Sequence, residues 1–289
     1  MVQHAADSVH VEERWLAHPQ GRLFTRRWAP ADAAADARAA SSQRSPIVLF
    51  HDSLGAVELW REFPSLLAIA TGRAVIAYDR LGFGRSDPRV GRPSLDFVAE
   101  EAAIYFPAVL EQLGLNRFVA LGHSVGGGMA IHSAVRFQQR CEALITIASQ
   151  VFAEDHTLDG IRAAREQFRD AQQIQRLARY HGEKARWVLE AWTECWLDPA
   201  FAHWSVAGVL PKVRCPVLAI HGDRDEYASG VHPRMIGELS GGGAQVELLA
   251  DTGHVPHRER PELVLSLIAK FLHDVSAVMP DSMRHPRGG

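Results

Sequence analysis

The sequence has few cysteines, no long apolar run and no signal-peptide pattern. Its three cysteines, Cys141, Cys195 and Cys215, are an odd number at wide spacing without a Cys-x-x-Cys pair, which argues against a disulfide framework or a zinc site. No apolar run approaches the roughly 18 residues that a membrane span needs, and the N-terminus has neither a basic nor an apolar region of a signal peptide. We therefore expect a cytoplasmic protein without a membrane span.

Charge of neither sign dominates the chain. The formal net charge is −3, and no run rich in Lys or Arg occurs, so we do not expect nucleic acid as a partner. The 289 residues are 47% hydrophobic and 22% charged, which is typical of a globular protein with one large core and room for an inserted subdomain. Nothing in the sequence indicates the oligomeric state.

Apolar strand patterns alternate with helical patterns along most of the chain. Strands are predicted over 9–17, 22–29, 47–50, 73–78, 117–122, 144–148, 217–220 and 245–249, and helices over 60–70, 95–113, 125–138, 231–239 and 261–274. Most of these strands are apolar throughout, which is typical of a parallel sheet covered on both faces. We expect a mostly parallel sheet of about eight strands with helices on both faces, and a surface loop over 30–46.

The alternation stops between residues 151 and 211. Residues 157–180 and 183–197 have helical patterns, and no strand pattern occurs among them. We interpret 151–211 as a helical cap inserted into a discontinuous core made of residues 1–150 and 212–289. Such a cap would cover the carboxyl edge of the sheet, where open α/β sheets bind ligands.

The most informative motif is Gly-x-Ser-x-Gly around Ser124. A strand pattern leads into it and a helical pattern follows, which is the sequence form of a nucleophile elbow. A serine on such a turn is pushed out of the sheet, where a base and a substrate carbonyl can reach it. The motif alone would arise by chance in roughly one chain in ten of this length, so the argument depends on the residues that follow.

A nucleophilic serine needs a base and a carboxylate that orients the base. In this topology they follow the serine in the order acid, then histidine, each after a later strand. Asp223 and Asp225 follow the strand over 217–220, and His254 follows the strand over 245–249. The sequence therefore predicts Ser124 as the nucleophile and His254 as its base, with one of the two aspartates as the acid.

Five segments together resemble the serine-nucleophile members of the α/β-hydrolase fold superfamily. The segments are His-Asp-Ser-Leu-Gly at 51–55, Tyr-Asp-Arg-Leu-Gly-Phe-Gly-Arg-Ser at 78–86, Gly-His-Ser-Val-Gly-Gly at 122–127, His-Gly-Asp-Arg-Asp at 221–225 and Gly-His-Val-Pro-His-x-Glu-x-Pro at 253–261. The resemblance implies an α/β-hydrolase fold with an inserted helical cap. Its form Gly-x-x-Asp selects Asp225 as the acid, beside Ser124 and His254.

The resemblance also implies an oxyanion hole built from two backbone N–H groups. One belongs to Val125, directly after the nucleophile, at a helix N-terminus where the dipole favours an anion. The other is expected from Ser53. Family members usually carry His-Gly where this chain has His51-Asp52, so Leu54 stays an alternative to Ser53 as the second donor.

Side chains of the cap and of the loops next to the triad are candidates for substrate binding. Each cap tryptophan either packs the cap or lines an apolar acyl or aryl pocket. The candidates are Leu54, Trp187, Trp192, Trp196, Trp204, Tyr227 and Val255.

The expected activity is hydrolysis of a small to medium apolar or aryl carboxylic ester through an acyl-enzyme, with a small-molecule substrate and neither metal nor cofactor. The same triad serves C–C bond hydrolysis of a diketone, lactone opening, thioester or amide cleavage, and acyl transfer, and these alternatives stay open. Epoxide and haloalkane hydrolysis are disfavoured, because those family members use a carboxylate where this chain has Ser124. A ligand-binding protein without turnover is a further alternative, against which the complete triad argues.

Overall fold

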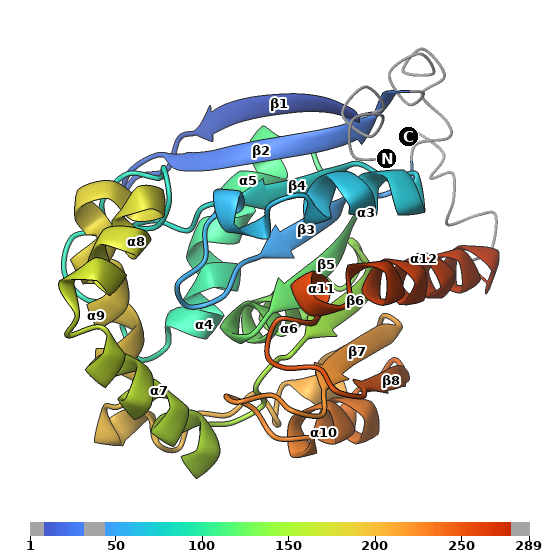
Figure 1. Cartoon of the computed structure of the whole chain (residues 1–289). Coiled ribbons are helices and arrows are strands. Elements are labelled where there is room, and N and C mark those ends of the chain that lie inside the picture. The colour runs from blue at the N-terminus through green and yellow to red at the C-terminus, as the bar shows by residue number, and fades with distance from the viewer. Residues whose placement is uncertain (1–8, 32–43, 279–289) are drawn as a thin grey trace.

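The computed structural model of the chain describes residues 9–31 and 44–278. Its centre is an eight-stranded sheet in the order β1-β2-β4-β3-β5-β6-β7-β8 (Figure 1). The strands are β1 (Val9–Leu16), β2 (Leu23–Pro30), β3 (Ile47–Phe50), β4 (Val75–Tyr78), β5 (Phe118–His123), β6 (Cys141–Ile147), β7 (Val217–Gly222) and β8 (Ala244–Leu249). Strand β2 is antiparallel to β1 and β4, and the other pairs are parallel. The expected mostly parallel sheet is confirmed; residues 32–43 of the expected loop lie outside the described residues.

The central strands are buried on both faces. Every residue of β3, β4, β5, β6 and β7 is buried, whereas the edge strands β1 and β8 are half exposed. Alternate side chains point into two separate cores: Ile47 and Leu49 of β3 belong to one, and Val48 and Phe50 to the other. Continuous apolar runs in the sequence therefore mark strands that are covered from both sides.

Helices cover both faces of this sheet, as expected. The core on one face contains side chains of α3 (Phe63–Thr71) and α12 (Pro261–Val278). The core on the other face contains side chains of α4 (Phe97–Glu100), α5 (Phe106–Gln112), α6 (Val125–Arg136) and α10 (Val231–Leu239). Figure 1 shows α3 and α12 together on one side of the sheet. The short helix α11 (Pro256–Glu259) precedes α12.

The helix expected over 95–113 is interrupted. A π-helical turn, Glu101–Tyr105, separates α4 from α5. Pro107 follows that turn, and a proline has no N–H to continue the α-helical hydrogen-bond ladder. The helix ends as the sequence predicts, because Gly114 has φ +61°, the left-handed conformation typical of a residue just past a helix C-terminus.

Three helices lie between β6 and β7: α7 (Asp155–Gln167), α8 (Ala171–His181) and α9 (Ala185–Trp196). They stand together at the edge toward which β3 points (Figure 1). The single helix expected over 157–180 is two helices, because Asp170 has extended backbone and its side chain accepts a hydrogen bond from Gln172 N, which starts α8. A short 3₁₀ turn, Gly182–Lys184, connects α8 to α9, and two more, Pro199–Phe201 and Leu210–Lys212, lie between α9 and β7.

Polar side chains between α8 and α9 hold the α7–α9 segment to the loops after β3 and β4. His181 Nδ1 accepts a hydrogen bond from Gly84 N at 2.8 Å, and its Nε2 donates to Leu54 O at 3.0 Å. Lys184 Nζ donates to Gly84 O at 2.8 Å. Because His181 needs one bare and one protonated ring nitrogen for these bonds, the contact requires a neutral imidazole.

A buried ion pair lies at the opposite, amino edge of the sheet. Arg73 Nη2 and Glu142 Oε1 are 2.7 Å apart, and their side chains are 3% and 7% exposed. Arg73 also donates to Ser45 O and to Ser276 Oγ. The guanidinium thereby connects the segments just before β3 and β4 with β6 and with α12.

Replacing Glu142 by Gln should lower the free energy of unfolding by about 3 kcal/mol, because it leaves the Arg73 guanidinium buried without its counter-charge. Denaturant titration measures the change. Asp274→Asn, which breaks the exposed pair between Lys270 and Asp274, should leave the free energy nearly unchanged. Equal losses in the two variants would contradict the prediction.

Acidification should weaken the contact made by His181. Burial lowers the pKa of His181 to about 4, whereas an unfolded histidine titrates near its ordinary value of 6.5. The unfolded chain therefore takes up a proton between these two values that the folded chain does not, so stability falls as the pH drops through that window. At neutral pH, wild type should be more stable than His181→Gln.

The stability difference between wild type and His181→Gln should shrink by on the order of 2 kcal/mol from pH 7 to pH 4. Denaturant titration at a series of pH values measures it, and the comparison cancels the other titrating groups. His273→Gln on the exposed side of α12 is the matched control and should show no such trend. A constant difference for His181→Gln would rule the effect out.

Candidate active site

The carboxyl ends of the parallel strands bring five sequence-distant residues to one edge of the sheet. Ser53 follows β3, Ser124 follows β5, Gln150 follows β6, Asp225 follows β7 and His254 follows β8. All five line one cavity or contact a residue that does. This is the edge at which open α/β sheets bind ligands.

The turn between β5 and α6 holds Ser124 in a strained backbone conformation. Ser124 has φ 55° and ψ −128°, which side-chain-bearing residues rarely adopt. The turn needs glycine on both sides: a Cβ on Gly122 would lie 2.1 Å from Gly126 O, and a Cβ on Gly126 would lie 2.1 Å from Phe50 O. The two glycines thus let α6 start against β3 while the hydroxyl of Ser124 projects into the cavity.

Ser124, His254 and Asp225 form one chain of hydrogen bonds. Ser124 Oγ lies 3.0 Å from His254 Nε2, and His254 Nδ1 lies 2.8 Å from both carboxylate oxygens of Asp225. Ser124 and Asp225 are buried, and His254 is 9% exposed. The geometry fits a neutral imidazole that donates to the carboxylate and accepts the serine proton.

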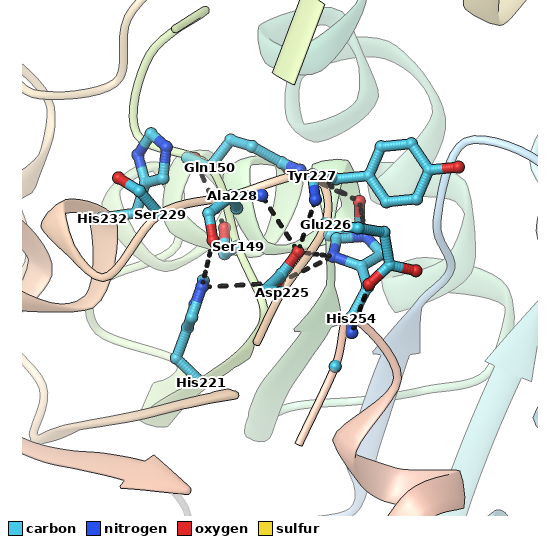
Figure 2. A network of polar contacts seen from close by, with 12 residues as sticks. Ser149, Gln150, His221, Asp225, Glu226, Tyr227, Ala228, Ser229, His232 and His254 are labelled. Carbon is cyan, nitrogen blue, oxygen red and sulfur yellow. Dashed lines mark hydrogen bonds and ion pairs between the residues drawn. The ribbon is translucent and has the colours of Figure 1, made fainter. Parts of the chain in front are cut away.

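Asp225 is held as an ionised acceptor (Figure 2). Its Oδ1 accepts hydrogen bonds from Tyr227 N at 2.8 Å and Ala228 N at 3.0 Å. Burial opposes ionisation of this carboxyl, but the hydrogen bonds from His254 and from Tyr227 N outweigh it and lower its pKa. Asp223, the other candidate acid, is exposed and faces Thr252 N at 3.3 Å instead.

Of the two backbone N–H groups after β3 that could bind an oxyanion, those of Ser53 and Leu54, one already has a hydrogen-bond partner. Asp52 Oδ1 accepts a hydrogen bond from Leu54 N at 2.9 Å, the local turn that an aspartate at this place favours. Leu54 N is therefore not free to bind an oxyanion, whereas Ser53 lines the cavity. Val125 is the first residue of α6, where a backbone N–H has no partner within the helix.

Asp52 and His123 form a second polar pair next to the Ser124 turn. Asp52 Oδ2 lies 3.3 Å from His123 Nδ1, and His123 Nε2 donates to the backbone carbonyl of His254 at 2.8 Å. Burial disfavours the charge on Asp52, but the bond to His123 outweighs it and holds the pKa of Asp52 well below its usual range. This pair connects the loop after β3, the serine turn and the loop that carries the histidine.

A cavity that is partly open to solvent lies over Ser124. Its apolar and aromatic wall includes five of the candidate substrate-binding residues: Leu54, Trp192, Trp196, Tyr227 and Val255. The other lining residues are Asp52, Ser53, His123, Ser124, Gln150, Thr157, Ile161 and His254. Among the described residues, the wall contains no Lys or Arg.

Two of the candidate tryptophans lie away from this cavity. Trp187 packs on Phe83, with ring centroids 5.6 Å apart, and its indole N–H donates to Gly91 O. Trp204 stacks on Phe201 at 5.3 Å. The structure therefore places Trp187 in the contact with the loop after β4 and Trp204 in the packing beneath α9.

Several residues near Ser124 were not predicted from the sequence as site residues. His123, Gln150, Thr157 and Ile161 line the cavity, as does Asp52, which the sequence marks only as a departure from the usual His-Gly. Gln150 had a signal, because it lies just past the end of β6 as the other site residues lie past their strands. Ile161 and Thr157 had none, because a helix in isolation does not show which side faces the sheet.

One aspartate and one histidine of the motif segments at 78–86 and 253–261 lie outside the chain of hydrogen bonds from Asp225 to Ser124. Asp79 accepts hydrogen bonds from Val57 N and Arg85 N, and burial raises its pKa to about 6. Asp79 therefore holds the loop after β4 together. His257 is buried among the rings of Trp60 and His123.

Neither a metal cluster nor a membrane-crossing helix occurs in residues 9–31 and 44–278. No group of three or more His, Cys, Asp or Glu side chains in this part of the chain is arranged to hold a metal ion. None of its helices is long and apolar enough to cross a membrane.

Curated relatives share parts of this sequence. The chain is similar to the human 1-acylglycerol-3-phosphate O-acyltransferase ABHD5, with 36% identity over 118 residues that cover 39% of this chain and 32% of the relative. It thus spans about a third of the length of that relative. It is also similar to the bifunctional esterase/perhydrolase DCH of Acinetobacter calcoaceticus, with 26% identity over 71% of this chain and 79% of the relative.

The fold has relatives among solved structures as well. The proline iminopeptidase of Mycobacterium smegmatis matches with a TM-score of 0.68 and 22% identity, covering 91% of this chain and 98% of the other. The model of the alpha/beta hydrolase fold family matches residues 45–261. That span is well over half of the chain and contains the serine turn, the α7–α9 segment and the histidine loop. The chain therefore belongs to the alpha/beta hydrolase fold family.

Proposed function

We propose that this protein is a serine hydrolase that cleaves small to medium apolar or aryl carboxylic esters through an acyl-enzyme. The observation that carries the proposal is the unbroken chain of short contacts from Asp225 through His254 to Ser124 Oγ at the floor of a cavity. Only a serine with a base within hydrogen-bond reach becomes a useful nucleophile at neutral pH. The absence of Lys and Arg from the described cavity wall argues against an anionic substrate.

In the first half of the reaction, Ser124 Oγ attacks the ester carbonyl carbon while its proton passes to His254 Nε2. Asp225 holds the ring in the required tautomer and stabilises the imidazolium that forms. The N–H groups of Ser53 and Val125 bind the oxyanion of the tetrahedral intermediate. His254 then gives its proton to the leaving alkoxide, which departs as the alcohol.

In the second half, His254 takes a proton from a water molecule that attacks the acyl carbon. The tetrahedral intermediate collapses, the carboxylic acid leaves, and Ser124 Oγ regains its proton from His254 Nε2. Every proton moves between the substrate, water, the serine and the imidazole, so the cycle closes without a cofactor.

Residues 151–211 are proposed to be a cap that selects the substrate. Thr157 and Ile161 of α7 and Trp192 and Trp196 of α9 line the cavity, whereas the polar floor comes from the ends of the strands. A wall built on an insertion can change its shape while the floor stays in place. The size of the acyl or alcohol group is therefore expected to depend on α7 and α9.

Removing the Ser124 hydroxyl should abolish ester hydrolysis. Ser124→Ala should lower kcat/KM for p-nitrophenyl acetate and butyrate by about a thousandfold or more, because no nucleophile remains. A fluorophosphonate probe should label wild type and not this variant. Ser133→Ala is the matched control, since Ser133 lies on α6 in the core and its hydroxyl has no hydrogen-bond partner among the described residues.

Ser133→Ala should keep both turnover and labelling. Wild-type turnover no greater than that of Ser124→Ala would exclude ester hydrolysis as the activity. A wild-type protein that the fluorophosphonate does not label at Ser124 would exclude every version of the serine mechanism.

Shortening Trp192 should enlarge the cavity. Trp192 lines it and packs edge-on against Tyr227, with ring centroids 6.1 Å apart. In Trp192→Ala the ratio of kcat/KM for p-nitrophenyl octanoate over butyrate should rise about tenfold, the order expected when a pocket gains room for apolar groups. Trp187→Ala, away from the cavity, should leave the ratio unchanged; an equal shift in both variants would speak against a selective wall at Trp192.

A further inference from the structure

The side-chain amide of Gln150 is a buried polar group that the protein leaves nearly unused. Gln150 is 3% exposed and lines the cavity beside Ser124, above Asp225 in Figure 2. Within the described residues its amide has two contacts, both with Ser124 Oγ, at 3.4 Å from Oε1 and 3.5 Å from Nε2. Good hydrogen bonds of these atoms are about 2.7–3.2 Å long. A buried amide with only such long contacts calls for a partner.

The indole N–H of Trp196 is also buried without a partner among the described residues, but an indole can only donate. The remaining buried or charged polar side chains of the cavity have closer partners. Thr157 donates to Tyr227 O at 2.6 Å, and His123 donates to His254 O at 2.8 Å. Asp52 accepts from Leu54 N at 2.9 Å. The hydroxyl-bearing residues Ser53 and Tyr227 are partly exposed, so water can reach them. Gln150 is thus the buried cavity residue whose donor and acceptor are both left for a ligand.

The backbone holds Gln150 firmly in this place. Ala148, two residues earlier, has φ +50°, a strained conformation for a residue with a side chain, at the point where the chain leaves β6. Val151, the next residue, donates its N–H to His232 Nδ1 at 3.1 Å, and its carbonyl accepts from Val206 N at 2.8 Å. The backbone from which the Gln150 side chain extends is therefore fixed before any substrate arrives.

The direction of the acyl chain follows from the other contacts of Ser124. In a tetrahedral intermediate on Ser124 Oγ, the leaving group faces His254, and the oxyanion faces the N–H groups of Ser53 and Val125. The acyl chain takes the direction that remains. Gln150 touches Ser124 Oγ and makes no hydrogen bond with His254, so its amide is within reach of the first carbons of the acyl chain.

We propose that Gln150 recognises an oxygen on the second or third carbon of the acyl group, so that the preferred substrates are esters of 2- or 3-hydroxy or oxo acids. The amide nitrogen donates to that oxygen, and the amide oxygen accepts from it when it is a hydroxyl. This inference rests on the proposed ester hydrolysis and names its acyl substrate. A plain alkanoyl group would leave the buried amide without a partner, which penalises binding of that substrate.

The test compares ethyl butanoate with ethyl 2-hydroxybutanoate and ethyl 3-hydroxybutanoate, with acid release followed in a pH-stat on the full chain. Wild type should favour at least one hydroxy ester over the plain ester by on the order of 10- to 100-fold in kcat/KM. Gln150→Met, which keeps the length but removes donor and acceptor, should bring that ratio close to one. Gln175→Met on the exposed surface of α8 is the matched control and should keep the wild-type ratio.

The outcomes separate this inference from the function on which it rests. Wild type that hydrolyses the plain and hydroxy esters equally well overturns the role of Gln150 and leaves ester hydrolysis standing. A Gln150→Met variant that loses activity on all esters by the same factor also overturns it, because that is the behaviour of a residue that only positions Ser124. Failure of wild type on every ester overturns both.

If Gln150→Met does not fold, Gln150→Glu tests whether the amide of Gln150 donates to the acyl oxygen. A carboxylate keeps an acceptor but loses the amide donor, so the preference for an oxo ester, ethyl 3-oxobutanoate, over ethyl butanoate should fall, while a hydroxyl can still donate. An unchanged preference for the oxo ester in Gln150→Glu would contradict the proposed donor. The wild-type ratio of kcat/KM for the hydroxy esters over ethyl butanoate is measured whether or not Gln150→Met folds.

Discussion

The strained turn at Ser124 is the constraint on which the arrangement of the site depends. Its left-handed backbone is possible because Gly122 and Gly126 let α6 begin in contact with β3 and β5. A side chain at either glycine would push the helix away from the sheet. The hydroxyl would then lose its place over the sheet edge, and His254, which comes from 130 positions later in the sequence, would have nothing to contact.

The cavity combines two kinds of wall with separate origins. The floor is polar and comes from the carboxyl ends of neighbouring parallel strands, whose mutual spacing is set by backbone hydrogen bonds. The roof is apolar and aromatic and comes from α7 and α9. The contacts of Asp52 and His123 connect the loops that form the floor. His181 binds the helices of the roof to the loop after β4. The polar floor and the apolar roof of the cavity are therefore built by separate parts of the fold.

Local patterns predicted the elements that local physics controls. The apolar runs of the central strands required burial on both faces, and the structure confirms the mostly parallel sheet. Gly114 ends its helix as predicted. The breaks at Asp170 and before Pro107 were missed because the apolar spacing continues across them, and a cap or a missing N–H interrupts the backbone without changing that spacing. The order serine, aspartate, histidine was readable because each residue follows a strand.

The sequence by itself determined the sheet and the positions of Ser124, Asp225 and His254 directly after their strands. Its motifs also indicated the fold family to which the chain belongs. Their catalytic roles stay predictions, although the structure brings them within hydrogen-bond distance. Only the tertiary structure decided that Trp192 and Trp196 line the cavity while Trp187 and Trp204 do not. It also decided that the buried amide of Gln150 has only long contacts, both with Ser124 Oγ. The reason is physical: strand periodicity and motif order are properties of neighbours in the chain, whereas the facing side of a helix and the partner of a buried amide are set by segments far away in the sequence.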